Sequence, residues 1–229
     1  MHTAEAAHCS SDAPSCTDRP RADPSVLLSP VLCADGRLRC PWALSTPDVL
    51  DDHDTSWGIR PQLRSEWFRA LSLEILQAGL APGASVSRLP ALEEVFSCFD
   101  PRIVAGLDDD AVDELLLDRR LIRNRAKLTA VVVAARAVRS WSGEDWQREL
   151  EPAEGTDHVQ AVAGRLREHG LVHAGPGTIA RLLARTGMTP GHLDGCVRCG
   201  RGRELLSACL VPGSDARRPG PSAGVLVRP

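Results

Sequence analysis

The stretch "ALSLEILQAGL", residues 70–80, is a largely apolar run that carries one carboxylate, Glu74, near its middle. Placed on an α-helix at about 100° per residue, Glu74 shares a face with Trp67 and Leu71, and other apolar side chains cover the remaining faces. We therefore predict a helix over residues 60–80 that is buried on all sides. A buried carboxylate costs on the order of several kcal/mol unless another group compensates its charge, so Glu74 needs a partner.

Most of the remaining patterns between residues 39 and 200 are also helical. Alternation typical of strands is almost absent, so we predict an all-α fold. A Gly-, Glu- and Pro-rich stretch at 142–156 is expected to interrupt the helices. The predicted helical segments after the first one are residues 108–121, which begin with acidic capping residues, then 123–141, 158–170 and 178–187.

Both ends of the chain differ in composition from its centre. Residues 1–38 are rich in Ser, Pro, Asp and Ala, and residues 201–229 are rich in Arg, Pro and Gly. We expect two mobile tails around one folded domain at 39–200.

The overall composition is that of a globular protein. Of 229 residues, 43% are hydrophobic and 25% are charged, and the net charge of -3 argues against a protein that coats nucleic acid by bulk electrostatics. A local basic patch is still compatible with that charge. Without an apolar stretch of 18 residues or a basic leader before an apolar core, we expect a cytoplasmic protein with no membrane association.

The eight cysteines are too dispersed for a compact disulfide scaffold, which favours free thiols or metal ligands. His192 and Cys196 can lie one helical turn apart, and Cys40 with His53 could complete a Cys2His2 zinc set. Cys196 and Cys199 form a rival pair. Chance spacing explains the same pattern, so the residues alone leave the three interpretations open.

The segment "HAGPGTIARLLARTG", residues 173–187, places Gly-Pro-Gly between two helical stretches. Gly175 and Gly177 would let the backbone turn tightly and approach a large anion, and the amides that open the helix at Thr178 could hold a phosphate. This arrangement is typical of a helix-hairpin-helix DNA-binding element, and a plain tight turn between helices is the alternative.

A second basic segment, "IRNRAKL" at residues 122–128, carries Arg123, Arg125 and Lys127 near a helix start. These side chains could contact phosphate. A solvated helix face is the more usual role of such a run.

Taken together, six motifs resemble the 3-methyladenine DNA glycosylase I family of helix-hairpin-helix base-excision enzymes. Their order and approximate spacing match over about 160 residues, which is far more specific than any single motif. The six are Cys40-Pro-Trp42, "HDTSWG" (53–58), "LEILQAGL" (73–80), "FDP" (99–101), "LIRNRAKL" (121–128) and "GHLDGC" (191–196). The resemblance implies a monomer that binds double-stranded DNA carrying an alkylated purine.

The resemblance also implies a structural zinc ion. Its four ligands fall on Cys40, His53, His192 and Cys196. Such a site would clip the N-terminal segment of the domain to its C-terminal segment.

The family's base-binding glutamate falls on Glu74, to which we assign base recognition and catalysis, with Trp42, Trp57 and Asp52 as further base contacts. An N3-alkylated adenine is cationic, so a buried carboxylate would gain its counter-charge when the damaged base is flipped in. Neutral adenine would leave Glu74 unpaired. The implied reaction is hydrolysis of the N-glycosidic bond of the damaged nucleotide.

Three aromatic positions of the family pattern carry other residues here. Val49 and Asp52 stand at two tyrosine positions, and Pro82 stands at a tryptophan position. Each lost ring removes stacking of roughly 1–3 kcal/mol per base contact. Two alternatives follow, namely a self-resistance glycosylase for bulky natural-product N3-purine adducts and a non-catalytic protein that binds damaged DNA.

Overall fold

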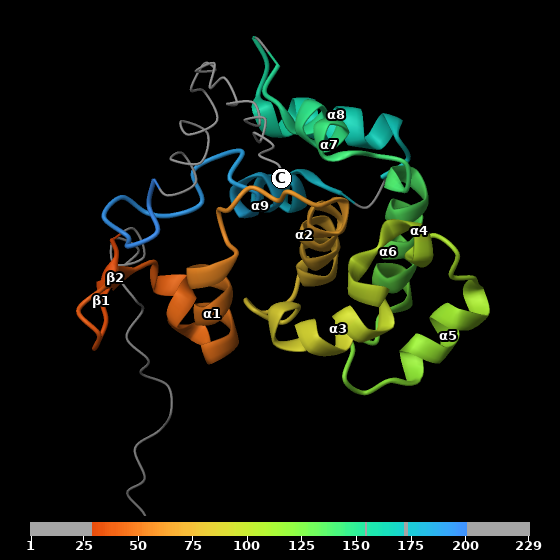
Figure 1. Ribbon diagram of the computed structural model, residues 1–229, viewed down its shortest axis with the longest axis horizontal. Helices are drawn as coiled ribbons and strands as arrows, with labels where there is room; N and C mark the ends of the chain where they lie inside the picture. Colours follow the sequence, from red (N-terminus) through yellow and green to blue (C-terminus); the bar gives the residue numbers. More distant parts are fainter. Residues whose placement is uncertain (1–28, 154, 172–173, 201–229) are drawn as a thin grey trace, which may run out of the picture.

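Helix α2, Arg64–Gln77, is the apolar helix expected around residues 70–80, and it lies near the centre of the fold (Figure 1). The computed structural model describes residues 29–153, 155–171 and 174–200, which are mostly helical. Every residue from 70 to 77 is buried, which confirms the prediction for this part of the helix. The helix is shorter than predicted because the backbone is extended at Leu63 and leaves the helical conformation at Ala78.

Helix α6, Arg125–Val138, packs along α2 and supplies a hydrogen-bond donor to the carbonyl groups at the C-terminal end of α2. The ammonium group of Lys127 donates to the carbonyls of Ile75 and Leu76 at 3.3 and 2.6 Å. These carbonyls belong to the last turn of α2, where a cation compensates unpaired oxygens and the helix dipole. Lys127 therefore holds two helices together, so the expected solvated face does not describe it.

A group of short helices covers one side of α2 and α6. They are η3 (Val86–Arg88), α3 (Leu89–Val95), η4 (Ser97–Phe99), α4 (Pro101–Val104) and α5 (Asp109–Leu117). The buried ring of Phe99 packs with Phe68 of α2 and with Phe96, which lies between α3 and η4. Helix α5 begins as predicted, because the carboxylate of Asp108 accepts a hydrogen bond from the amide of Ala111.

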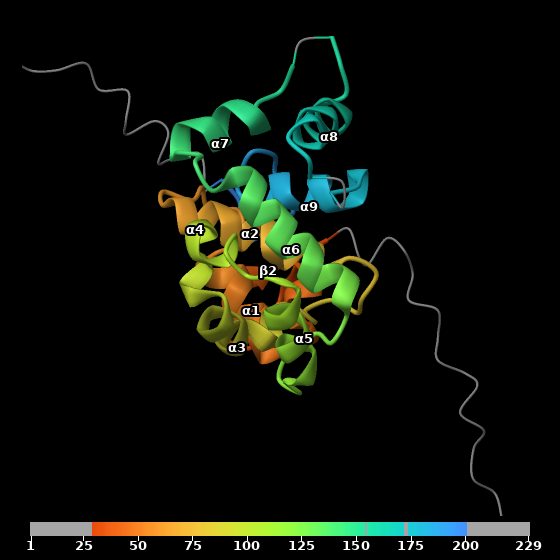
Figure 2. The ribbon, with the colours of Figure 1, turned by 90° about the vertical axis from the view of Figure 1, so that its right-hand side faces the viewer.

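Three further helices follow, and Figure 2 shows α7 and α8 above α9. They are α7 (Gly143–Leu150), α8 (His158–Glu168) and α9 (Pro176–Arg185). Helix α7 lies inside the stretch where we expected a break, so that expectation was wrong. Ser142 and Asp145 form a capping box at its start, and the buried side chains of Trp146 and Leu150 hold it against the core.

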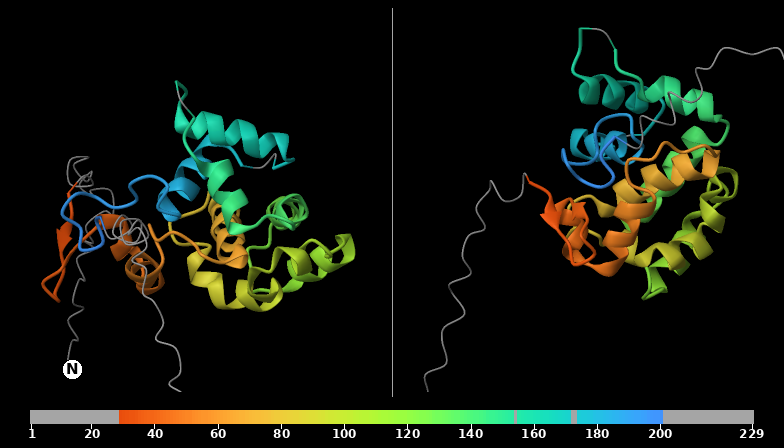
Figure 3. Two further views of the ribbon diagram at one scale, coloured as in Figure 1. Left: turned by 45° about the horizontal axis from the view of Figure 1, so that its top comes forward. Right: turned by 60° about the vertical axis from the view of Figure 1, so that its left-hand side comes forward.

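The two ends of the described chain lie side by side (Figures 1 and 3). The N-terminal end forms the antiparallel pair β1 (Val31–Leu32) and β2 (Leu38–Arg39), then η2 (Pro41–Ser45) and α1 (Pro47–Thr55). The amide of Val197 donates to the carbonyl of Leu38 at 2.7 Å. Residues 31–38, which we assigned to the N-terminal tail, thus take part in a strand pair that contacts the C-terminal segment.

Residues 1–28 and 201–229, which make up most of the two predicted tails, lie outside the described residues. Within the described ranges, no helix is both long enough and apolar enough to cross a membrane.

Candidate active site and metal centre

A cavity of about 260 Å³ lies between α1, α2, α9 and the loop that follows α2. The four residues predicted to contact the base all line it, and so do the other two positions at which an aromatic residue of the family pattern is missing. These residues are Trp42, Asp52, Trp57 and Glu74, together with Val49 and Pro82. The fold thus brings together side chains from three separate segments, around residues 42–57, 74–82 and 181–185.

Glu74 is almost fully buried at 1% exposure and already has two partners. Its Oε2 accepts a hydrogen bond from Nε of Arg181 at 2.6 Å, and its Oε1 accepts one from Nε of Arg185 at 2.7 Å. The expectation that Glu74 is unpaired without a cationic base is therefore wrong. Two arginines on α9 compensate its charge inside the protein.

Arg185 links Glu74 to a second buried carboxylate. Its Nη1 lies 2.9 Å from Oδ1 of Asp52, and its guanidinium carbon lies 4.5 Å from the ring centre of Trp57. Burial alone would lower the pKa of Arg185, but the carboxylates of Glu74 and Asp52 outweigh burial and raise it. Arg185 is therefore a fixed positive charge beneath the cavity.

Neither arginine was predicted from the sequence. Arg181 and Arg185 are four residues apart on α9, a spacing that places both side chains on one helix face. The predicted buried Glu74 required a counter-charge, and two arginines with this spacing on another apolar helix were the signal that could have identified them.

Two tryptophans form an aromatic corner of the cavity. The ring centres of Trp42 and Trp57 are 4.9 Å apart, and the planes are tilted by 58°. The indole N–H of Trp57 donates to the carbonyl of Gly191 at 2.8 Å. A β-carbon at Gly191 would lie 2.6 Å from the carbonyl oxygen of Ala184, so this close approach requires glycine.

The loop after α2 is fixed by Gln77, a residue that the sequence analysis did not single out. Its amide group donates to the carbonyls of Leu80 and Ala81 at 3.2 and 2.6 Å, and its Oε1 accepts from the amide of Ser85 at 3.1 Å. Gln77 therefore holds the loop that carries Pro82 at the cavity.

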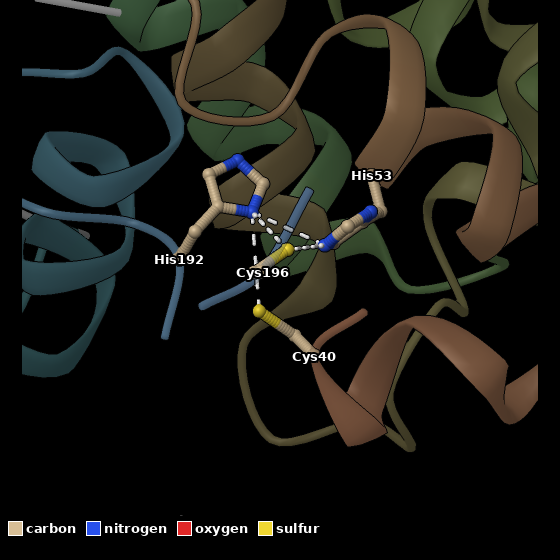
Figure 4. A group of neighbouring side chains, drawn as sticks. All are labelled: Cys40, His53, His192 and Cys196. Atoms are coloured by element: carbon tan, nitrogen blue, oxygen red, sulfur yellow. Dashed lines mark hydrogen bonds between the residues drawn. The ribbon is translucent and has the colours of Figure 1, made fainter. Parts of the chain in front are cut away.

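The four predicted metal ligands converge at one point (Figure 4). The ligand atoms of Cys40, His53, His192 and Cys196 all lie within 4.8 Å of one another. His192 Nδ1 lies 3.1 Å from His53 Nε2 and 3.9 Å from the Cys40 sulfur, and the Cys196 sulfur lies 3.4 Å from His53 Nε2. Tetrahedral zinc with its usual bond lengths separates neighbouring ligand atoms by roughly 3.3–3.8 Å, so this donor set fits such an ion.

The groups around this cluster also suit a metal centre. His53 Nδ1 lies 2.7 Å from a carboxylate oxygen of Asp54, and His192 Nε2 lies 3.0 Å from the carbonyl oxygen of Trp57. Metal-binding histidines usually direct their second ring nitrogen at such an acceptor. Burial lowers the pKa of both imidazoles, which favours the neutral form that binds metals.

The two thiols are buried and have amide donors. Burial raises the pKa of Cys40 to about 11, whereas the amide of Leu193, 3.3 Å from its sulfur, opposes this shift. A cation among the four ligand atoms would stabilise the thiolate form of both cysteines. The rival ligand Cys199 stays outside the cluster, with its exposed sulfur 3.8 Å from Oδ1 of Asp194.

The N-terminus of α9 is open to solvent on its glycine side. Gly175, the N-cap, has φ -69°, and β-carbons at Gly175 or Gly177 would meet nothing within 4 Å. Other residues also adopt this conformation, so the backbone does not require glycine at Gly175. No side chain caps the backbone amides at the N-terminus of α9. Thr178, in the first turn of the helix, is buried. Residues 172–173 of the predicted hairpin lie outside the described residues.

Comparison with known proteins assigns the chain to a family. A sequence model of methyladenine glycosylase matches residues 42–199, so the chain belongs to the methyladenine glycosylase family. It is 28% identical over 179 residues to the DNA-3-methyladenine glycosylase of Haemophilus influenzae, covering 69% of this chain and 96% of the relative. It is 25% identical over 177 residues to DNA-3-methyladenine glycosylase 1 of Escherichia coli, covering 69% of this chain and 95% of the relative.

The fold is shared with solved structures. The 3-methyladenine DNA glycosylase I of Staphylococcus aureus superposes with a TM-score of 0.63 at 24% sequence identity. The match covers 71% of this chain and 97% of that one. The similarity includes nearly the whole solved protein.

Proposed function

We propose that this chain is a DNA-3-methyladenine glycosylase that hydrolyses the N-glycosidic bond of N3-alkylated adenine in DNA. The observation that carries the proposal is Glu74, a buried carboxylate on the wall of a cavity that also contains Trp42 and Trp57. Both curated relatives are named as glycosylases of this specificity, and the Staphylococcus aureus structure concerns 3-methyladenine recognition.

The proposed reaction requires mainly that the protein bind and orient the damaged nucleotide. A purine alkylated at N3 is positively charged and already a good leaving group. The site need mainly hold the flipped base, orient its sugar and admit water. Glu74 attracts the charged base into the cavity, and Trp42 and Trp57 offer ring faces for stacking. When the glycosidic bond breaks, its electrons pass to the base, which leaves as a neutral purine, and water adds to the sugar carbon that has taken over the positive charge.

The open end of α9 is the proposed DNA contact. Helices α8 and α9 are the two helices of the proposed helix-hairpin-helix element. The exposed backbone at Gly175 and Gly177 lets phosphate approach, and the amide of Thr178 with the helix dipole attracts it. This contact anchors double-stranded DNA without regard to sequence, and the protein acts as a monomer in the bacterial cytoplasm.

Cys40, His53, His192 and Cys196 hold a structural zinc ion in this proposal. Four protein ligands fill a tetrahedral site, which leaves no position for substrate. The ligands are next to cavity residues in sequence, since Asp52 precedes His53 and Trp42 follows Cys40 by two residues. Zinc binding therefore positions one wall of the cavity against the C-terminal segment.

The two alternatives have different support. The named relatives are glycosylases, so they give no support to a protein without catalysis. A preference for bulky N3 adducts rests on Val49 and Pro82, small side chains that line the cavity.

The proposed function is tested by incubating the purified chain with duplex DNA methylated at adenine N3 and analysing the released bases by mass spectrometry. Free 3-methyladenine should appear, while release of normal adenine should stay at background. No release above a protein-free control would overturn the proposal.

A further inference from the structure

Arg181 occupies the place beside Glu74 that a charged base would need. The two oxygens of Glu74 have separate partners, because Arg181 binds Oε2 and Arg185 binds Oε1. Both arginines and Glu74 line the same cavity. A cationic base that pairs with Glu74 must therefore compete with one of the two guanidinium groups.

The two arginines differ in how firmly they are held. The side chain of Arg185 is 8% exposed, binds Asp52 as well as Glu74, and lies over the ring of Trp57. The side chain of Arg181 is 42% exposed, and Glu74 is its only ion-pair partner within the described residues. Removing Arg181 from Oε2 leaves Oε1 of Glu74 paired, whereas removing Arg185 disrupts two carboxylates.

The charge balance of the cavity also indicates that Arg181 is the arginine that can be displaced. At their ordinary charges, Glu74 and Asp52 contribute two negative charges, and Arg181 and Arg185 contribute two positive charges. The cavity is therefore balanced without a ligand. When Arg181 moves into solvent, one negative charge is left, which matches a singly charged base.

We propose that Arg181 is a displaceable counter-ion that covers Glu74 in the free protein and gives way to the cationic base. The inference rests on the proposed function for the identity of the base. Arg181 is then a specificity-determining residue, because a neutral purine offers no charge to replace the one that leaves. Separating Arg181 from Glu74 without replacement would leave a buried carboxylate oxygen unpaired.

The test measures binding of a cationic purine by titration calorimetry, independently of base release. The probe is 3,9-dimethyladeninium, which carries a fixed positive charge as the lesion in DNA does, and neutral 9-methyladenine is the matched ligand. Arg181→Met removes the charge but keeps an apolar stem. Arg102→Met removes an exposed arginine on α4 that does not line the cavity, and serves as the charge-matched control.

Arg181→Met should bind the cation about ten-fold or more tightly than Arg102→Met does, the scale of one charge-assisted hydrogen bond. Affinity for 9-methyladenine should stay unchanged. Equal or weaker cation binding by Arg181→Met would overturn the proposal, and Arg181→Gln provides a second truncation if the methionine variant does not fold. Arg181→Lys should fall between the wild type and Arg181→Met.

A double-mutant cycle ties the effect to Glu74. In a Glu74→Gln background, Arg181→Met should no longer increase cation affinity, because no carboxylate is left to uncover. A gain of the same size in that background would show that Arg181 acts elsewhere. The two proposals can fail separately. If Arg181→Met binds the cation more tightly and the wild-type protein still releases no base from DNA, the proposed function fails and the counter-ion role of Arg181 stands.

Discussion

Arg185 joins two buried carboxylates from different helices, with Nε 2.7 Å from Glu74 on α2 and Nη1 2.9 Å from Asp52 on α1. These three polar residues line a cavity whose other lining residues are mostly apolar. Because removal of one partner from a buried ion pair leaves an uncompensated charge, these three residues contribute to folding.

Arg185→Met should therefore lower the free energy of unfolding by about 3–5 kcal/mol, the usual cost of breaking a buried pair. Urea denaturation followed by circular dichroism measures this. Arg181→Met should cost clearly less, since Arg185 still pairs with Glu74. Equal losses for the two variants would show that the arginines are not held differently.

The metal centre predicts about one zinc ion per chain in the purified protein. Cys40→Ser and His192→Ala should lower both the zinc content, measured by plasma mass spectrometry, and the melting temperature. Cys199→Ser is the matched control, because its sulfur lies outside the four-ligand cluster. Metal-free wild-type protein, or a Cys199→Ser protein that loses its zinc, would contradict the assignment.

At the start of α9, Gly177→Asp should weaken binding to undamaged duplex as well as to damaged duplex, because phosphate contacts are blind to base identity. The free protein should tolerate the new side chain, since the space around Gly177 is open. Fluorescence anisotropy with Ser140→Asp, an exposed position outside α8 and α9, controls for the added negative charge. Unchanged binding by Gly177→Asp would exclude this helix end as the anchor.

Pro82→Trp tests whether the cavity is widened for bulky adducts. A tryptophan there should raise excision of 3-methyladenine by adding a stacking surface, and it should lower excision of large N3 adducts by filling their space. The two effects must have opposite signs, which competition assays on both substrates can measure. Changes in the same direction would indicate that cavity width does not select the adduct.

The sequence identified the elements whose signals are local. The buried helix around Glu74 was predictable because apolar residues occupy all its faces, and α5 was predictable from its acidic cap. Helix α7 was missed because its Gly- and Glu-rich start looked like a break, although the spacing of Ser142 and Asp145 marked a helix start.

Pairings across the chain were harder to predict. Arg181 is 107 residues from Glu74, so no local pattern connects them, and only the packing of α9 against α2 brings them together. Cys40 and His192 are 152 residues apart, and their meeting was expected only from the resemblance to a known family. Long-range contacts of this kind depend on the whole fold, whereas helix patterns depend on a few neighbouring residues.

The central claim is that Glu74 recognises a cationic base, and Glu74→Gln tests it most directly. The substitution leaves Arg185 and Arg181 without their shared carboxylate, so stability should fall, and excision must be compared at equal folded fraction. In single-turnover assays on 3-methyladenine-containing duplex, we predict that Glu74→Gln loses at least about 100-fold in excision rate, or about 2.7 kcal/mol of transition-state stabilisation. A folded Glu74→Gln protein that releases 3-methyladenine at the wild-type rate would contradict the account.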